Sequence, residues 1–156
     1  MRGDFHTHST LDDGKNSLEE MAAAARAAGL THFGFSGHSY CPLEEDYCIP
    51  REKIPEYLAR ARAVQARYAG EMEVFVGLEL DLLGERPEGL DYAIGSVHTI
   101  CGGDGRHFAV DESPETARQC VEEFFGGDWY RYTDAYYDQV ALLAERTGCD
   151  WVGHFD

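Results

Sequence analysis

Residues 73–80 read Glu-Val-Phe-Val-Gly-Leu-Glu-Leu, a short apolar run that contains one carboxylate, Glu79, near its end. Valine, phenylalanine and leucine over this length are typical of a buried β-strand, which we predict over Glu73–Gly77. A carboxylate without a partner is costly in such surroundings. Glu79 therefore needs a cation, which an arginine or a metal ion can supply.

Strand-like and helical segments alternate along the rest of the chain. Further strands are expected at Asp4–His8, Thr31–Ser36, Asp91–Val97 and Asp150–Gly153. Helices are expected at Ser17–Ala28, Pro55–Ala69, Pro114–Phe125 and from Asp128 to Thr147, the first with an S-x-x-E capping box. The stretch between Glu79 and Asp91 has no helical pattern. This order predicts an α/β fold with a parallel sheet covered by helices and, within that class, a barrel.

Length and charge exclude several classes of function. The 156 residues fit one domain, and Asp plus Glu (29) exceed Lys plus Arg (13), so the formal net charge is −16. Such a charge repels phosphate backbones and anionic lipids, so neither nucleic-acid binding by a basic patch nor membrane binding is expected. No apolar run of membrane-spanning length and no signal peptide are evident, and the five cysteines include no C-x-x-C pair. We therefore expect a cytoplasmic protein with reduced thiols.

Residues that can bind metal occur repeatedly at the carboxyl ends of the predicted strands. They are His6, His8, His38, Glu79, His98 and His154. In parallel barrels and open α/β sheets this edge carries the active site. Five strands that each deliver such a side chain to one edge predict a metal centre.

The spacing of the first two histidines suits a shared metal ion. His6 and His8 are two residues apart, so in a strand their imidazoles point to the same side. Asp13 lies on the turn just beyond them, whereas Asp12 is expected to be a solvated turn residue. Glu79 has two oxygens and can bridge two metal ions about 3.5–4 Å apart, as dinuclear hydrolytic sites require.

Other interpretations of single residues stay open at this level. His98 and His154, each taken alone, are also compatible with hydrogen-bonded core histidines. His32 begins its strand and His107 lies in a glycine-rich loop, so both are expected to be structural or solvated. A zinc site made of His38, Cys41 and Cys48 lacks a fourth ligand. The chain contains no phosphate-binding P-loop, no G-x-G-x-x-G motif and no G-x-S-x-G motif, which leaves metal-assisted hydrolysis.

The motifs and their order resemble those of the polymerase and histidinol phosphatase (PHP) family. The matching stretches are Phe5-His-Thr-His8 with Asp13-Gly14, Gly34-Phe-Ser-Gly-His-Ser39, Gly77-Leu-Glu79, Gly95-Ser-Val-His98 and Gly153-His-Phe-Asp156. Ser36-Gly-His-Ser-Tyr40, Tyr47-Cys48 and Val110-Asp-Glu112 are similar to the histidinol-phosphatase branch. The resemblance extends over the whole chain.

The resemblance implies a distorted (β/α)7 barrel with two or three divalent metal ions, Zn, Mn or Fe, at its carboxyl-terminal rim. It implies that His6, His8 and Glu79 bind a first ion, that Glu79, His98 and His154 bind a second, and that Asp13 and His38 bind a third. Glu79, His98 and Asp13 are then the expected catalytic residues. Family members carry two more ligands in a D-x-H motif near the carboxyl terminus, and no such motif follows the His154 stretch here. We therefore expect an amino-terminal partial barrel of about five strands, incomplete at its carboxyl end.

The implied activity is hydrolysis of a small phosphate monoester, with L-histidinol phosphate as the leading substrate in histidine biosynthesis. Two alternatives remain. One keeps the metals but acts on another small phosphate ester or a nucleotide. The other is a metal-binding PHP domain without catalytic activity. The oligomeric state cannot be predicted from the sequence.

Overall fold

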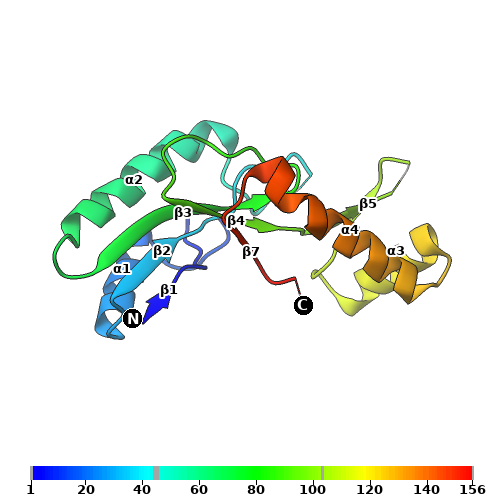
Figure 1. The fold of residues 1–156 in the computed structure, drawn as a ribbon, viewed down its shortest axis with the longest axis horizontal. Helices are drawn as coiled ribbons and strands as arrows, with labels where there is room; N and C mark the ends of the chain where they lie inside the picture. The colour runs from blue at the N-terminus through cyan, green and yellow to red at the C-terminus, as the bar shows by residue number, and fades with distance from the viewer. Residues whose placement is uncertain (1, 44–45, 103, 156) are drawn as a thin grey trace.

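A five-stranded sheet forms the centre of the computed structural model, which describes residues 2–43, 46–102 and 104–155. The strands are β1 (Gly3–Asp4), β2 (His32–Phe35), β3 (Glu73–Asp81), β4 (Tyr92–Ser96) and β7 (Trp151–Val152). Their order in the sheet is β1-β2-β3-β4-β7, and every neighbouring pair is parallel (Figure 1). The predicted α/β class and parallel half-barrel of about five strands are confirmed.

Four helices connect the strands: α1 (Leu18–Ala27), α2 (Ile54–Arg67), α3 (Pro114–Phe125) and α4 (Trp129–Thr147). A short 3-10 turn, η1 (Arg51–Lys53), precedes α2. Ser17 and Glu20 form the predicted capping box, and Asp128 accepts hydrogen bonds from the first amides of α4. Gly148 ends α4 with a φ of 64°, a backbone conformation that glycine adopts without a steric penalty.

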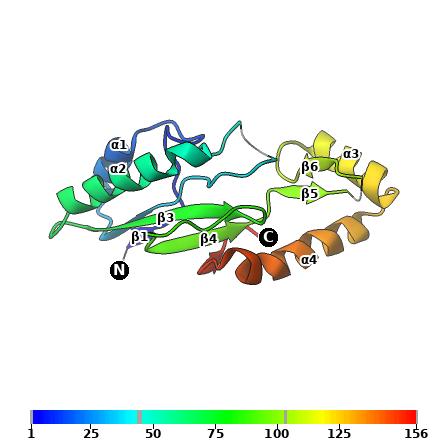
Figure 2. The same ribbon diagram turned by 90° about the horizontal axis from the view of Figure 1, so that it is seen from above.

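Side chains alternate between two faces along β3. Val74, Val76, Leu78 and Leu80 belong to the buried core that α1 and α2 complete. Figure 2 shows these two helices side by side along one face of the sheet. The intervening residues, which include Phe75 and Glu79, point to the opposite face, because successive side chains of a strand alternate. A single strand therefore supplies both the core and the polar side of the sheet.

An aromatic layer covers the part of that second face that lies away from the carboxyl ends of the strands. The rings of Phe5, Phe75, Tyr92 and Trp151 contact one another, with centroids 5.0–5.8 Å apart. Tyr92 lies so close to β3 that a Cβ atom on Gly77 would come within 2.5 Å of its ring. Its hydroxyl lies 2.7 Å from the carbonyl of Phe5 and 2.9 Å from that of Phe35, and these two acceptors share its one proton. The layer lies on the same face of the sheet as the polar residues at the strand ends and packs next to them.

The structure differs from the sequence-based prediction at several boundaries. The first strand was expected to run to His8, but ladder pairing ends at Asp4. The backbone of Thr7 instead bonds to Ser36: its amide donates to the Ser36 hydroxyl, and its carbonyl accepts from the Ser36 amide. β3 continues to Asp81, beyond the predicted end at Gly77, because pairing with β4 continues through that residue.

The antiparallel hairpin of β5 (Thr99–Cys101) and β6 (His107–Ala109) was not predicted, and His107, expected in a glycine-rich loop, begins β6. Its strands have three residues each, too few for an alternating pattern to be visible in the sequence. As expected, residues 82–91 contain no helix. No helix among the described residues is long and apolar enough to cross a membrane.

Candidate metal centre

Glu79 occupies the centre of the polar face of the sheet. It is 1% exposed, near the carboxyl end of β3. Its backbone amide donates to the carbonyl of Gly37, and its carbonyl accepts from the amide of Ser39, which brings His38 beside it in a parallel bridge. Backbone pairing thus fixes the position of Glu79 independently of its side-chain contacts.

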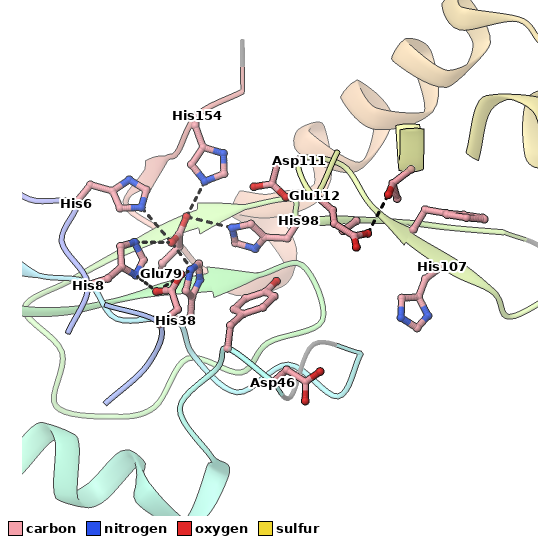
Figure 3. Close-up of a pocket in the computed structure, with 15 residues that line it drawn as sticks. His6, His8, His38, Asp46, Glu79, His98, His107, Asp111, Glu112 and His154 are labelled. Atoms are coloured by element: carbon pink, nitrogen blue, oxygen red, sulfur yellow. Dashed lines mark hydrogen bonds and ion pairs between the residues drawn. The ribbon is translucent and has the colours of Figure 1, made fainter. Parts of the chain in front are cut away.

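Five histidines surround this carboxylate, as Figure 3 shows. The atoms near Oε2 are Nε2 of His6 (3.0 Å), Nε2 of His8 (3.5 Å) and Nδ1 of His38 (3.3 Å). Those near Oε1 are Nε2 of His154 (2.9 Å) and Nε2 of His98 (3.4 Å), and the hydroxyl of Ser96 also donates to Oε1 at 2.6 Å. These histidines come from the segments that follow β1, β2, β4 and β7, so the parallel strands bring together residues distant in sequence, as predicted.

Asp13 lies at the edge of this cluster. Its Oδ1 is 3.4 Å from Nδ1 of His8 and 3.9 Å from Nε2 of His38, and its side chain is 48% exposed. The cluster forms one wall of a cavity of about 680 Å³ that extends to the β5–β6 hairpin and the start of α3. All seven predicted site residues line this cavity, whereas the metal ligation expected of them stays a prediction.

The donor set fits a divalent metal ion. Among the described residues, Oε2 of Glu79 and Nε2 of His98 are buried and have no hydrogen-bond partner, although buried polar atoms are normally satisfied. Imidazole nitrogens and carboxylate oxygens are the ligands of zinc and related ions. Two compact groups include Glu79: His6, Glu79 and His154, and His8, His38 and Glu79. The resemblance had instead implied the pairs His6 with His8 and His98 with His154.

Charged groups in the cluster change one another's pKa values. Burial alone would raise the pKa of Glu79, but the nearby rings of His154, His6 and His98 hold it far below its usual range. Burial alone would lower the pKa of His98, but Asp81 and Glu79 raise it to about 10. His38 is affected most by its burial, and its pKa falls to about 4. The carboxylate is therefore ionised and ready to accept a cation.

Two buried aspartates beside the cluster were missed. Asp12 was predicted as a solvated turn residue, but its side chain is buried and accepts a hydrogen bond from Nδ1 of His8 at 2.8 Å. That prediction was wrong because the turn folds back against the residues after β2, where the amide of His38 also donates to Asp12. Asp81, the last residue of β3, contacts Nδ1 of His98 at 3.4 Å. Its position two residues after Glu79, which puts both side chains on the same face of β3, was the available signal.

The remaining histidines and cysteines have different positions. His32 lies at the opposite end of β2, against Thr31 and Glu73, as expected. His107 is exposed, as predicted for a solvated residue, but it also lines the cavity from β6, which the sequence did not indicate. Cys41 is buried and bonds to Asp81, and no compact metal-ligating group among the described residues contains a cysteine.

Comparisons with known proteins agree with this arrangement. The PHP domain family matches residues 4–156. A Deinococcus radiodurans protein named "Probable histidinol-phosphatase" is 34% identical over 98% of this chain and 60% of its own length. The DNA polymerase/3'-5' exonuclease PolX of Bacillus subtilis is 31% identical over 59% of this chain and 15% of its own length.

Two crystal structures share the fold. The candidate histidinol phosphatase hisK from Listeria monocytogenes superposes with a TM-score of 0.78 at 18% identity, over 92% of this chain and 61% of that one. Histidinol phosphate phosphatase from Lactococcus lactis, complexed with Zn, L-histidinol and phosphate, gives 0.61 at 21% identity, over 99% and 57%. The chain thus spans about 60% of the length of the three histidinol-phosphatase relatives and 15% of PolX. Its motifs, its half-barrel and the family match over residues 4–156 establish that this chain belongs to the PHP domain family.

Proposed function

We propose that this chain provides the metal-binding half of a phosphate monoester hydrolase of the histidinol-phosphatase type. The reaction is hydrolysis of L-histidinol phosphate to L-histidinol and phosphate. The observation that carries the proposal is the buried carboxylate of Glu79 with ring nitrogens of five histidines within 3.5 Å. The substrate is suggested by the Deinococcus relative's name and by the ligands of the Lactococcus structure.

The residues of the cluster have separate parts in this proposal. His6, His8, His38, His98 and His154 would hold two or three Zn, Mn or Fe ions together with Glu79 and Asp13. Bound ions would supply Lewis-acid charge and lower the pKa of water, which gives a nucleophile for attack at phosphorus. Glu79, through its two oxygens, joins the two sides of the cluster, because Oε1 and Oε2 face different histidines.

The charge of the protein gives these ions a second role. A chain with a net charge of −16 repels an anionic phosphate ester, so the substrate needs a local reversal of potential. Divalent ions at the cluster would provide that reversal. In this proposal residues 1–156 form a metal-dependent phosphoesterase domain.

Phosphate release tests the proposal. The chain is loaded with Zn, Mn or Fe and supplied with L-histidinol phosphate, and inorganic phosphate is measured. Glu79→Gln should abolish release, and the matched control Glu73→Gln, an exposed carboxylate at the start of the same strand, should not. Bound metal without phosphate release from any ester would favour a metal-binding domain without catalytic activity.

The match to PolX supports a second candidate, hydrolysis of a nucleotide phosphate. The net charge disfavours a polynucleotide but not a small nucleotide. A panel of phosphate esters ranked by kcat/KM separates the candidates. A nucleotide at the top of that ranking would contradict the histidinol-phosphate assignment.

A further inference from the structure

Two buried aspartates have the same relation to the metal cluster from opposite sides. Oδ2 of Asp12 accepts a hydrogen bond from Nδ1 of His8 at 2.8 Å, and Oδ2 of Asp81 lies 3.4 Å from Nδ1 of His98. In both histidines the other ring nitrogen, Nε2, faces Glu79 at 3.5 and 3.4 Å. Each aspartate therefore contacts the side of an imidazole that points away from the cluster.

The oxygens of both aspartates are already engaged. Oδ1 of Asp12 accepts from the amide and hydroxyl of Ser9, and Oδ2 accepts from His8 and the amide of His38. The Asp12 side chain is fully buried. Both lone pairs of each oxygen thus have partners, so Asp12 is unsuited to bind a metal directly, although it lies near His8 and Asp13.

Asp81 has an equivalent set of contacts on the other side. Its Oδ1 accepts from the amide of Leu83 at 2.9 Å and from the thiol of Cys41 at 3.5 Å. Its Oδ2 faces both the amide and the ring of His98 at 3.4 Å. The side chain is 6% exposed, so water competes little for these contacts.

We infer that Asp12 and Asp81 are positioning residues that keep the proton of His8 and His98 on Nδ1 and so present Nε2 to the metal ions. A carboxylate behind a metal-ligating histidine fixes the ring orientation and the tautomer and raises the basicity of the ligand. Asp12 has a second effect, because its bond to the amide of His38 ties the segment after β1 to the segment after β2. The inference rests on the proposed metal centre and adds to it the residues that orient its ligands.

Replacement by asparagine tests this role with little change in volume. An amide has one oxygen, so in Asp12→Asn either Ser9 or His8 faces the NH2 group. When the NH2 group faces His8, Nδ1 must accept, and the proton moves to Nε2, where it blocks metal binding. Asp81→Asn acts in the same way on His98. Asp91→Asn is the matched control, because Asp91 also accepts a backbone amide, that of Val76, but lies outside the cluster.

Metal affinity is measured for this chain by competition for Zn²⁺ with a chromophoric chelator. Asp12→Asn and Asp81→Asn should each weaken binding by about 10- to 100-fold, the range found for such partners. Asp91→Asn should leave affinity unchanged. In a His8→Ala background, Asp12→Asn should have no further effect if Asp12 acts through His8. Unchanged affinity in folded Asp12→Asn and Asp81→Asn would overturn the inference.

A second measurement needs no substitution. In protein with ¹⁵N-labelled histidine loaded with ¹¹³Cd²⁺, coupling to the metal should appear at Nε2 of His8 and His98, with Nδ1 protonated. Coupling at Nδ1 of either residue would overturn the inference even if the variants fail to fold. Failure of the unsubstituted chain to bind Zn²⁺ or Cd²⁺ would instead contradict the proposed metal centre itself, so the two proposals fail by different results.

Discussion

The two faces of β3 differ in how completely their side chains are satisfied. Toward α1 and α2, Leu78 and its neighbours are buried among apolar side chains. On the other face, Glu79 is equally buried but has an oxygen without a hydrogen-bond partner. Adjacent residues of one strand thus have opposite effects on stability. Apolar burial stabilises the fold, whereas an unsatisfied buried carboxylate costs stability unless a ligand compensates for it. The comparison separates the residues that hold the sheet from those that bind.

The largest effect on folding is expected from Leu78→Ala. Leu78 is fully buried, and truncation of such a leucine costs about 2–5 kcal/mol through lost burial and the cavity left behind. Urea unfolding measures the loss, and Leu142→Ala, at an exposed position of α4, is the control. Zn²⁺ affinity of the folded Leu78→Ala protein should stay unchanged. A parallel loss of metal affinity would show that the two faces are not independent.

Glu79→Gln should give the reverse result. Its Zn²⁺ affinity should fall by more than about 100-fold, since even the partners behind a ligand are worth about 10- to 100-fold. Its loss of unfolding free energy should be smaller than that of Leu78→Ala, because glutamine preserves the volume of the side chain and leaves no cavity. Titration with Zn²⁺ and urea unfolding of the metal-free protein check both parts. A stability loss larger than that of Leu78→Ala would give Glu79 a structural role as well.

Gly77→Ala tests the boundary between the aromatic layer and the cluster. Its new methyl group would lie within 2.5 Å of the Tyr92 ring, so Tyr92 must move and its bond to the carbonyl of Phe5 must lengthen. Overpacking of this kind costs about 1–3 kcal/mol. Because Phe5 precedes His6, we expect a weaker Zn²⁺ site together with the lower stability. Unchanged affinity would show that the aromatic layer does not position His6.

The smallest effect on stability is expected at Asp91, a carboxylate that already has hydrogen-bond partners. Asp91 accepts from the amide of Val76, from Arg62 and from Gln65. Burial alone would raise its pKa, but these bonds lower it. A carboxyl group with a lowered folded pKa stabilises the protein above its unfolded pKa, about 3.8, and that contribution is lost as the pH falls through the folded value.

Asp91→Asn should therefore reduce the free energy of unfolding at neutral pH by about 1 kcal/mol or less, since solvent screens this partly exposed pair. The difference from the unsubstituted chain should shrink below pH 4. Urea unfolding at a series of pH values measures it. A difference that stays constant to pH 2 would mean that the charge of Asp91 does not contribute.

Local chemistry made much of the fold predictable. The helix limits at Ser17, Ser113, Asp128 and Gly148 follow from side-chain caps and glycine ends, which depend only on nearby residues. The strand that carries Glu79 and the strand that precedes His98 were visible as apolar runs. The short pairing of β1 and the hairpin of β5 and β6 were not visible, since partners distant in sequence decide where pairing begins and ends.

The site shows the same division. The ligand-type residues at the strand ends could be identified from the sequence alone, because a parallel sheet places all its carboxyl ends at one edge. The packing of the folded chain is what brings His6 beside His154 and His8 beside His38, and what buries the Asp12 side chain behind His8. The physical reason is that strand order and loop packing set the distances between side chains, whereas sequence patterns specify only the face and the end at which each one lies.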